Sequence, residues 1–268
     1  MRNYLVFQLY GPLASWGDIA VGETRPSSLT PAKSAVLGLL AAALGIKHPA
    51  TVSDEAERAA LEAQHADLAG LYGSAFKVEA LGTPLSDYHT AQVPSSGKGK
   101  NRMVFSSRRD ELVWFSRHDL HTILSRRDYR QDAWATVALW ARSGAPLTLE
   151  TMCDALVSPR FVLYLGRKSC PPALPLAPRL VATETVEDAL AGMSLAQTFE
   201  GIWRDQEEAR RLVGKFQAEG ALMAWDTDAE TRLCPTETIT RRDALSSRRR
   251  WQFAVRLEHR VHFSEGQT

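Results

Sequence analysis

Residues 164–169, with the sequence YLGRKS, combine side chains that suit the recognition of nucleic acid. Tyr164 offers a ring on which a base can stack, and Gly166 allows a ligand to approach the main chain. Arg167 and Lys168 can neutralise phosphates, and Ser169 adds a hydroxyl donor. The alternative is a strand end with exposed charges and a glycine for the turn.

A second group surrounds the start of the first predicted helix. Arg25 precedes the helix, and Lys33 and Ser34 occupy its first turn. Free backbone amides and the positive end of the helix dipole can hold a phosphate at this position. We therefore predict ligand contacts from Arg25, Lys33 and Ser34. In the alternative, an upstream Ser or Thr only caps the helix and Arg25 pairs with a neighbouring glutamate.

A third group lies between residues 82 and 132, where the polar sequence SSGKGKNR separates the strand-like runs SDYHTAQV and ELVWFS. This pattern predicts an extended hairpin with its tip at the glycines. Its candidates for contact with RNA or with a neighbouring protein are Tyr88, His89, Lys98, Lys100, Arg102, Arg108 and Arg109, followed on the returning strand by Arg126, Arg127 and Tyr129. The sequence does not divide them between the two kinds of partner.

The charges are sorted along the chain although the formal net charge is only +1. Residues 96–130 carry nine basic and four acidic residues, residues 181–230 carry four basic and eleven acidic, and residues 231–262 carry eight basic and three acidic. Basic clusters with interleaved aromatics suit a polyanion whose bases can stack. A solvated surface is the alternative for any single cluster.

The elements that must position these groups follow from hydrophobic periodicity and from turn residues. The predicted order is a strand at 2–10, a helix from Thr30-Pro31 to Gly45, a helix over 54–71 with Ser53 as N-cap, a strand at 76–80, the inserted hairpin, a strand at 134–140, a helix over 147–157 and a strand at 161–165. This order predicts an α+β fold, a ferredoxin-like (RRM-like) palm over residues 1–178, with the hairpin inserted at about 82–132 as a thumb. Residues 179–268 are predicted to form a β-rich C-terminal extension packed on the palm.

Composition excludes several classes of protein. The chain has 268 residues, 44% of them hydrophobic, which is enough for a buried core. No apolar run approaches the roughly 20 residues of a membrane span, and the N-terminus shows no cleavable signal pattern, so we expect a cytoplasmic protein that does not engage membranes. Three dispersed cysteines without a CxxC pair predict neither a disulfide framework nor a metal site, and no nucleotide-cofactor motif is present. We predict no cofactor.

Six strings in register carry a resemblance to a known family. They are YLVFQLYGPLASWG at the start, the TRP that follows, the helix PAKSAVLGLLAAALGI, SDYHT at 86–90, TVALW, and SPRFVLYLGRKSCP at 158–171. Together they resemble the CRISPR-associated CasD family in its type I-E form, within the repeat-associated RNA-binding superfamily. The match covers roughly residues 1–178.

The resemblance implies a subunit of the Cascade surveillance complex that binds and caps the repeat-derived 5′ handle of the guide RNA. Its implied partners are the guide RNA, the backbone subunit and the large subunit, with target DNA reached only through the complex. In such complexes base pairing selects the target, while the protein recognises shape and backbone. The thumb and palm residues named above are the implied RNA contacts.

Two alternatives stay open. Relatives of the family in another subtype are metal-independent ribonucleases, and Tyr88, His89, Lys33 and Tyr129 could supply the acid and base that such cleavage needs. The resemblance to the type I-E form implies instead that a separate subunit cuts the RNA and that this chain is not an enzyme. The second alternative is a protein adaptor in which the acidic segment 181–230 docks on a basic partner.

Overall fold

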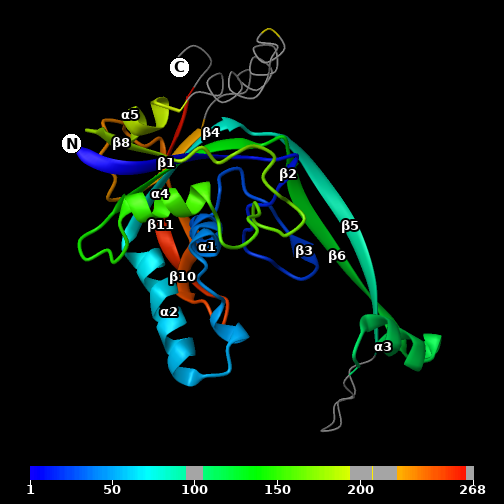
Figure 1. Ribbon diagram of the computed structural model, residues 1–268. Coiled ribbons are helices and arrows are strands. Elements are labelled where there is room, and N and C mark those ends of the chain that lie inside the picture. Colours follow the sequence, from blue (N-terminus) through cyan, green and yellow to red (C-terminus); the bar gives the residue numbers. More distant parts are fainter. Residues whose placement is uncertain (95–104, 194–206, 208–221, 264–268) are drawn as a thin grey trace.

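A computed structural model describes residues 1–94, 105–193, 207 and 222–263 of the chain (Figure 1). Its strands, in chain order, are β1 (Arg2–Tyr10), β2 (Leu13–Ala14), β3 (Thr24–Arg25), β4 (Tyr72–Ala80), β5 (Thr83–Pro94), β6 (Leu120–Gln131), β7 (Trp134–Ala141), β8 (Arg179–Thr183), β9 (Leu222–Asp226), β10 (Glu237–Ser247) and β11 (Gln252–His262). Its α-helices are α1 (Lys33–Leu44), α2 (Glu55–Gly70), α3 (Arg108–Trp114), α4 (Leu149–Val157) and α5 (Val186–Ala191). None of the helices in these described ranges is long and apolar enough to cross a membrane.

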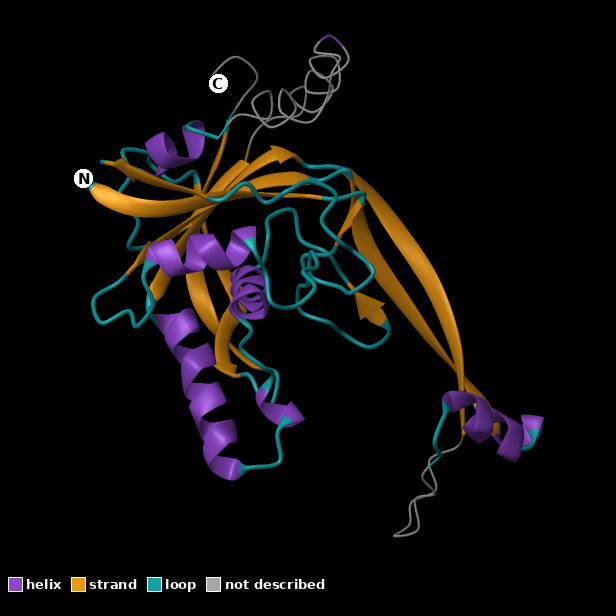
Figure 2. Ribbon diagram, in the orientation of Figure 1, coloured by secondary structure: helices purple, strands orange, loops and turns teal. Residues whose placement is uncertain are grey.

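The ferredoxin-like palm is confirmed by the order of its strands. Within a seven-stranded sheet, β8, β1, β7 and β4 are neighbours in that order, and every pair is antiparallel. The first strand of the unit therefore lies between the fourth and the third, as the split βαβ arrangement requires. Helices α1, α2 and α4 lie on one face of this sheet and α5 lies on the other (Figure 2).

Strand β1 shows why the palm forms at this sequence. Its run RNYLVFQLY is apolar on both sides of the pleat, and six consecutive residues are buried. Because successive side chains point to opposite faces, Leu5 and Phe7 pack with α1 and α4, while Tyr4 and Val6 pack with α5. The strand is thus covered on both faces.

The fourth palm strand is not where the sequence predicted it. Residues 161–165 form no strand, because Leu165 exchanges its backbone hydrogen bonds with Cys170 and Ser15 in a loop. Strand β8, which falls within the predicted C-terminal extension, pairs with β1 instead and fills that position. Strands β9, β11 and β10 continue the same sheet beyond β4, so the C-terminal strands share the palm sheet.

The predicted thumb is a long antiparallel hairpin of β5 and β6 that extends away from the palm (Figure 1). Its strands pair from Thr83 opposite Gln131 to Pro94 opposite Leu120. The run ELVWFS does not form the predicted strand. It lies largely in helix α3, which begins after the N-cap Ser107, whose hydroxyl accepts the amide of Asp110. The predicted tip, with Lys98, Lys100 and Arg102, lies outside the described residues.

Candidate nucleic-acid interface

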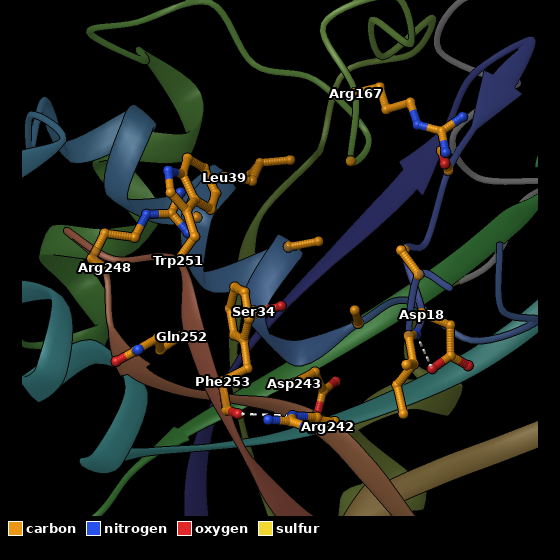
Figure 3. A pocket seen from close by; sticks show the side chains of 18 of the residues that line it. Asp18, Ser34, Leu39, Arg167, Arg242, Asp243, Arg248, Trp251, Gln252 and Phe253 are labelled. Atoms are coloured by element: carbon orange, nitrogen blue, oxygen red, sulfur yellow. Dashed lines mark hydrogen bonds between the residues drawn. The ribbon is translucent and has the colours of Figure 1, made fainter. Parts of the chain in front are cut away.

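A groove of about 910 Å³ runs beside the half-buried face of α1. Its other walls are the loop at residues 17–20, the segment 164–167 and the β10–β11 hairpin. Figure 3 shows Trp251 and Phe253 of the hairpin on one side of the groove and Arg167 on the other. The volume lies within the roughly 300–1,000 Å³ range of ligand sites in proteins.

Small residues on α1 make the floor of this groove. Ser34, Gly38 and Ala42 recur at intervals of four residues, so they share one face of the helix, and all three line the groove. Ser34 is half-buried and lines the groove, and its contact with a ligand stays a prediction. The lack of large side chains leaves room above the helix for a ligand.

Lys33 does not face this groove, so its predicted contact with phosphate is wrong for this structure. Its side chain is buried, and its ammonium group donates to Asp226 Oδ2 over 2.5 Å. Its backbone amide donates to Asp243 Oδ2 over 2.8 Å, which occupies the helix N-terminus, and the N-cap Ala32 offers no side-chain cap. Burial lowers the pKa of Lys33, and Asp226 opposes that effect. The amide and the ammonium group of Lys33 are therefore both occupied by carboxylates of the C-terminal strands.

The Asp226 and Asp243 carboxylates belong to a buried charge cluster between α1 and the C-terminal strands. Arg256 contacts Asp226 at 3.1 Å and Asp243 at 2.6 Å, and Arg260 contacts Glu258 at 2.8 Å. The full buried charge cluster consists of Lys33, Arg241, Arg256 and Arg260 with Asp226, Asp243 and Glu258. Burial lowers the pKa of Arg256, but its carboxylate partners raise the pKa by more than burial lowers it, so the net shift is upward. These cations stabilise the fold.

Arg167 and Tyr129 contact each other, which changes the role predicted for both. The Arg167 guanidinium lies 4.6 Å from the centre of the Tyr129 ring, and Tyr129 is only 8% exposed. Arg167 also donates to the carbonyl oxygens of Asp128 and Arg25, each over 3.2 Å. Because Tyr129 is almost fully buried beneath this cation, its ring is closed to a base. Arg167 joins the 164–169 segment to β6 and β3 and still lines the groove.

Gly166 is explained by close packing inside the protein. Its φ is +85°, a conformation that favours glycine, and a Cβ placed there would lie 1.8 Å from the carbonyl oxygen of Ser15. We predicted that a ligand would approach the main chain closely at Gly166, but the group that approaches it is the backbone of Ser15. Of the other residues in this segment, Tyr164 lines the groove half-buried, and Lys168 and Ser169 are exposed.

The base of the thumb brings candidates from three strands together. Arg25 on β3 lies opposite Arg127 on β6, and Tyr88 on β5 lies opposite Arg126. Opposed residues share a face and neighbours in a strand alternate, so Arg25, Arg127 and His89 lie on one face, while Tyr88 and Arg126 lie on the other. Tyr88 is 61% exposed. The sequence cluster is therefore divided between two faces.

Arg108 and Arg109 lie apart from this group, on α3 at the far end of the thumb (Figure 1). Tyr88 lies six residues from Pro94 and Arg127 seven residues from Leu120, the tip-side ends of their strands, which at about 3.4 Å per residue is roughly 20 Å. Arg108 pairs with Glu111, and Arg109 is exposed. The tip and the base of the thumb are therefore separate surfaces.

Comparison with known proteins decides the family. A family model described as CRISPR-associated protein (Cas_Cas5) matches residues 4–257. The chain belongs to the Cas5 family. A curated relative from Escherichia coli (strain K12), the CRISPR system Cascade subunit CasD, is 36% identical over 177 residues, which is 66% of this chain and 70% of the relative. This confirms the family predicted from the sequence.

Two solved structures share the fold of this Cas5-family chain. A chain described as a CRISPR RNA-guided surveillance complex has a TM-score of 0.55 at 18% identity, and the match covers 97% of this chain and 90% of that chain. A second, described as a crystal structure of a Cas protein, has a TM-score of 0.53 at 23% identity and covers 99% and 97%. Both matches include the C-terminal strands as well as the palm.

The structure does not gather the four residues named for ribonuclease chemistry in this Cas5 protein. Lys33 and Tyr129 are buried in the contacts described above, whereas Tyr88 and His89 are consecutive in an exposed strand and lie on opposite faces of it. These side chains could act on one bond only after rearrangement.

The β10–β11 hairpin contributes groove residues that the sequence analysis did not name. They include Arg242, Arg248, Trp251 and Phe253, and Asp243 of the buried charge cluster lines the groove as well. The available signal was the surplus of basic residues over 231–262 and the run SSRRRW at 246–251. That signal did not separate these arginines from those of the buried charge cluster, which lie on the same two strands.

Proposed function

We propose that this Cas5 protein is a non-catalytic Cascade subunit that binds and caps the repeat-derived 5′ handle of the guide RNA. Its partners would be the guide RNA, the backbone subunit and the large subunit, with target DNA engaged through the complex. The relative named as a Cascade subunit supports membership in such a complex. The handle-binding role is what the resemblance to the CasD family implies, and the surface chemistry described next supports it.

The convergence of cations at the thumb base is the observation that carries this proposal. Arg25 and Arg127 share a face, Arg167 bonds to the carbonyl of Arg25, and the groove continues from Arg167 along α1. No salt bridge to another described residue neutralises Arg25, Arg127 or the exposed Lys168. Such cations suit phosphates of a single strand, and the groove beside them suits its bases.

The test measures binding of end-labelled repeat RNA in the presence of a chelator, at several salt concentrations, on native and denaturing gels. We expect a salt-sensitive shift with intact RNA. Replacing Arg25, Arg127 and Lys168 by Ala should weaken binding, and the slope of log affinity against log salt should fall by about 0.7 for each phosphate that the variant no longer neutralises. The control is Arg232→Ala, an exposed cation paired with Asp188 away from the groove.

Two outcomes would overturn the proposal. Discrete cleavage of the repeat, abolished in His89→Ala or Tyr88→Phe, would make the protein a processing ribonuclease. RNA affinity that does not depend on salt would favour the protein adaptor named in the sequence analysis. The same would follow if the protein assembled normally with protein subunits but did not bind RNA. The acidic segment that the adaptor would use lies mostly outside the described residues.

A further inference from the structure

The turn of the β10–β11 hairpin holds an exposed tryptophan in a strained position. Trp251 has a φ of +52°, which bulky residues rarely adopt, and its side chain is 58% exposed. One side of its ring stacks on His48, with ring centres 4.9 Å apart and planes at 24°, and Arg248 lies 4.5 Å from its centre. Strained backbone of this kind persists only where neighbouring contacts hold it.

Those contacts come from α2 and fix the turn against the palm. Glu62 accepts the backbone amide of Arg249 over 2.9 Å, and the Arg249 side chain reaches Glu55 at 3.4 Å. Burial raises the pKa of Glu62, but hydrogen bonds from the turn outweigh this and lower it. The turn is therefore positioned before any ligand arrives.

Arg248 is a half-buried cation without an anionic partner. It forms no ion pair with another described residue, and its Nε is buried without a hydrogen-bond partner. It lies over Gly38 of α1, where a Cβ would come within 3.3 Å of its Nη2. Burial lowers the pKa of this guanidinium. Since buried cations are normally paired, this one has unused capacity for an anion inside the groove.

We propose that the β10–β11 turn is the second wall of the RNA site, where a stretch of single-stranded guide RNA lies between the hairpin and α1. Arg248 and Arg242 bind its phosphates, and Phe253 contacts its bases together with the part of the Trp251 ring that His48 and Arg248 leave exposed. The inference rests on the proposed function and extends it to the C-terminal strands. A peptide would not need the two cations beside the aromatic faces, whereas RNA uses both.

Binding of the same repeat RNA to hairpin variants tests this. Stacking on an aromatic side chain is worth about 1–3 kcal/mol per base, so Trp251→Ala should weaken affinity by about 5- to 150-fold, and Trp251→Phe should retain most of it. Arg248→Gln should weaken binding and reduce the salt slope by about 0.7. The matched control is Arg250→Ala, because Arg250 is exposed in the same turn and does not line the groove.

A cross-linking experiment on the unaltered protein keeps the proposal testable if a variant fails to fold. RNA that carries 5-iodouridine is irradiated with the protein, and tryptic peptides are mapped by mass spectrometry. We expect a cross-link on the peptide that follows Arg250 and contains Trp251 and Phe253.

The outcomes separate this inference from the proposed function. One combination of results would overturn the second wall alone. RNA affinity would fall when Lys168 and Arg127 are replaced, would be unchanged in the folded variants Trp251→Ala and Arg248→Gln, and no cross-link to the turn would form. Failure of the unaltered protein to bind RNA would overturn both. Trp251→Ala that keeps its RNA affinity but no longer assembles with a protein subunit would assign the groove to a protein segment instead.

Discussion

The two ends of the β10–β11 hairpin carry the same residue type in opposite circumstances. Toward the side away from the turn, beside β9 and the first turn of α1, Arg256 lies between Asp226, Asp243 and Glu258. At the turn, Arg248 lines the groove with no carboxylate in contact among the described residues. Both are arginines in one basic stretch of sequence. What separates a stabilising cation from a binding one is therefore the partner that the fold brings to it.

Removal of Asp226 should give the largest effect, because it breaks the paired end. Asp226 accepts hydrogen bonds from Lys33, Arg142, Arg256 and the Ser74 amide. Asp226→Ala leaves buried cations without their partner, which costs about 3–5 kcal/mol of unfolding free energy. Urea unfolding followed by circular dichroism measures the loss.

The matched control is Glu237→Ala, because Glu237 pairs with Arg260 of the same cluster, at 3.8 Å, but is 43% exposed. An exposed pair contributes up to about 1 kcal/mol. Equal losses in the two variants would show that the buried charge cluster contributes no more than a surface pair, and the contrast between the two ends would fail.

Lys33→Met sharpens the same contrast by separating stability from binding. Asp226 keeps Arg142 and Arg256 as partners, so the variant should lose only about 1.5–3 kcal/mol, the value of a hydrogen bond to a charged group. Its affinity for repeat RNA, measured on the folded protein, should stay within about twofold of the unaltered chain. A loss of RNA affinity as large as that of Lys168→Ala would show that Lys33 does contribute to RNA binding.

Local patterns explain why the sequence predicted most of the palm. The apolar run of β1, the helix α1 ended by Gly45 in the left-handed conformation, and β7 all follow from neighbouring residues. The strand predicted at residues 161–165 is wrong because Leu163 and Leu165 alternate in burial as in a strand, yet the backbone of Leu165 pairs with loop residues. Likewise, Asp54 rather than Ser53 caps α2, a shift of one residue.

The candidate site was less predictable because its cations depend on distant partners. Asp226 and Asp243 lie 193 and 210 residues from Lys33 in the chain, so no window of sequence shows that its amine and amide are occupied. Tyr129 and Arg167 likewise meet only in the fold. Trp251 was missed because its turn contacts the groove only once β10 and β11 join the palm sheet.

The smallest effect concerns the exposed edge of the buried charge cluster, where Arg142 bridges Asp226 and Asp228. The hydrogen bond from Arg142 lowers the pKa of Asp228 to about 2, below its value of about 3.9 in an unfolded chain. A carboxyl group with a depressed folded pKa contributes stability that is complete above the unfolded value and is lost as the pH falls through the folded one. Asp228 should therefore stabilise the fold above about pH 4 and lose that contribution between about pH 4 and pH 2.

Asp228→Asn should flatten this part of the curve of unfolding free energy against pH. Because Asp228 is 40% exposed, solvent screens the pair and the difference should be smaller than for Lys33→Met. If the curves of unfolding free energy against pH were parallel for Asp228→Asn and the unaltered protein, only the fully buried carboxylates would stabilise the fold. The boundary between the two ends of the hairpin would then lie at Asp226.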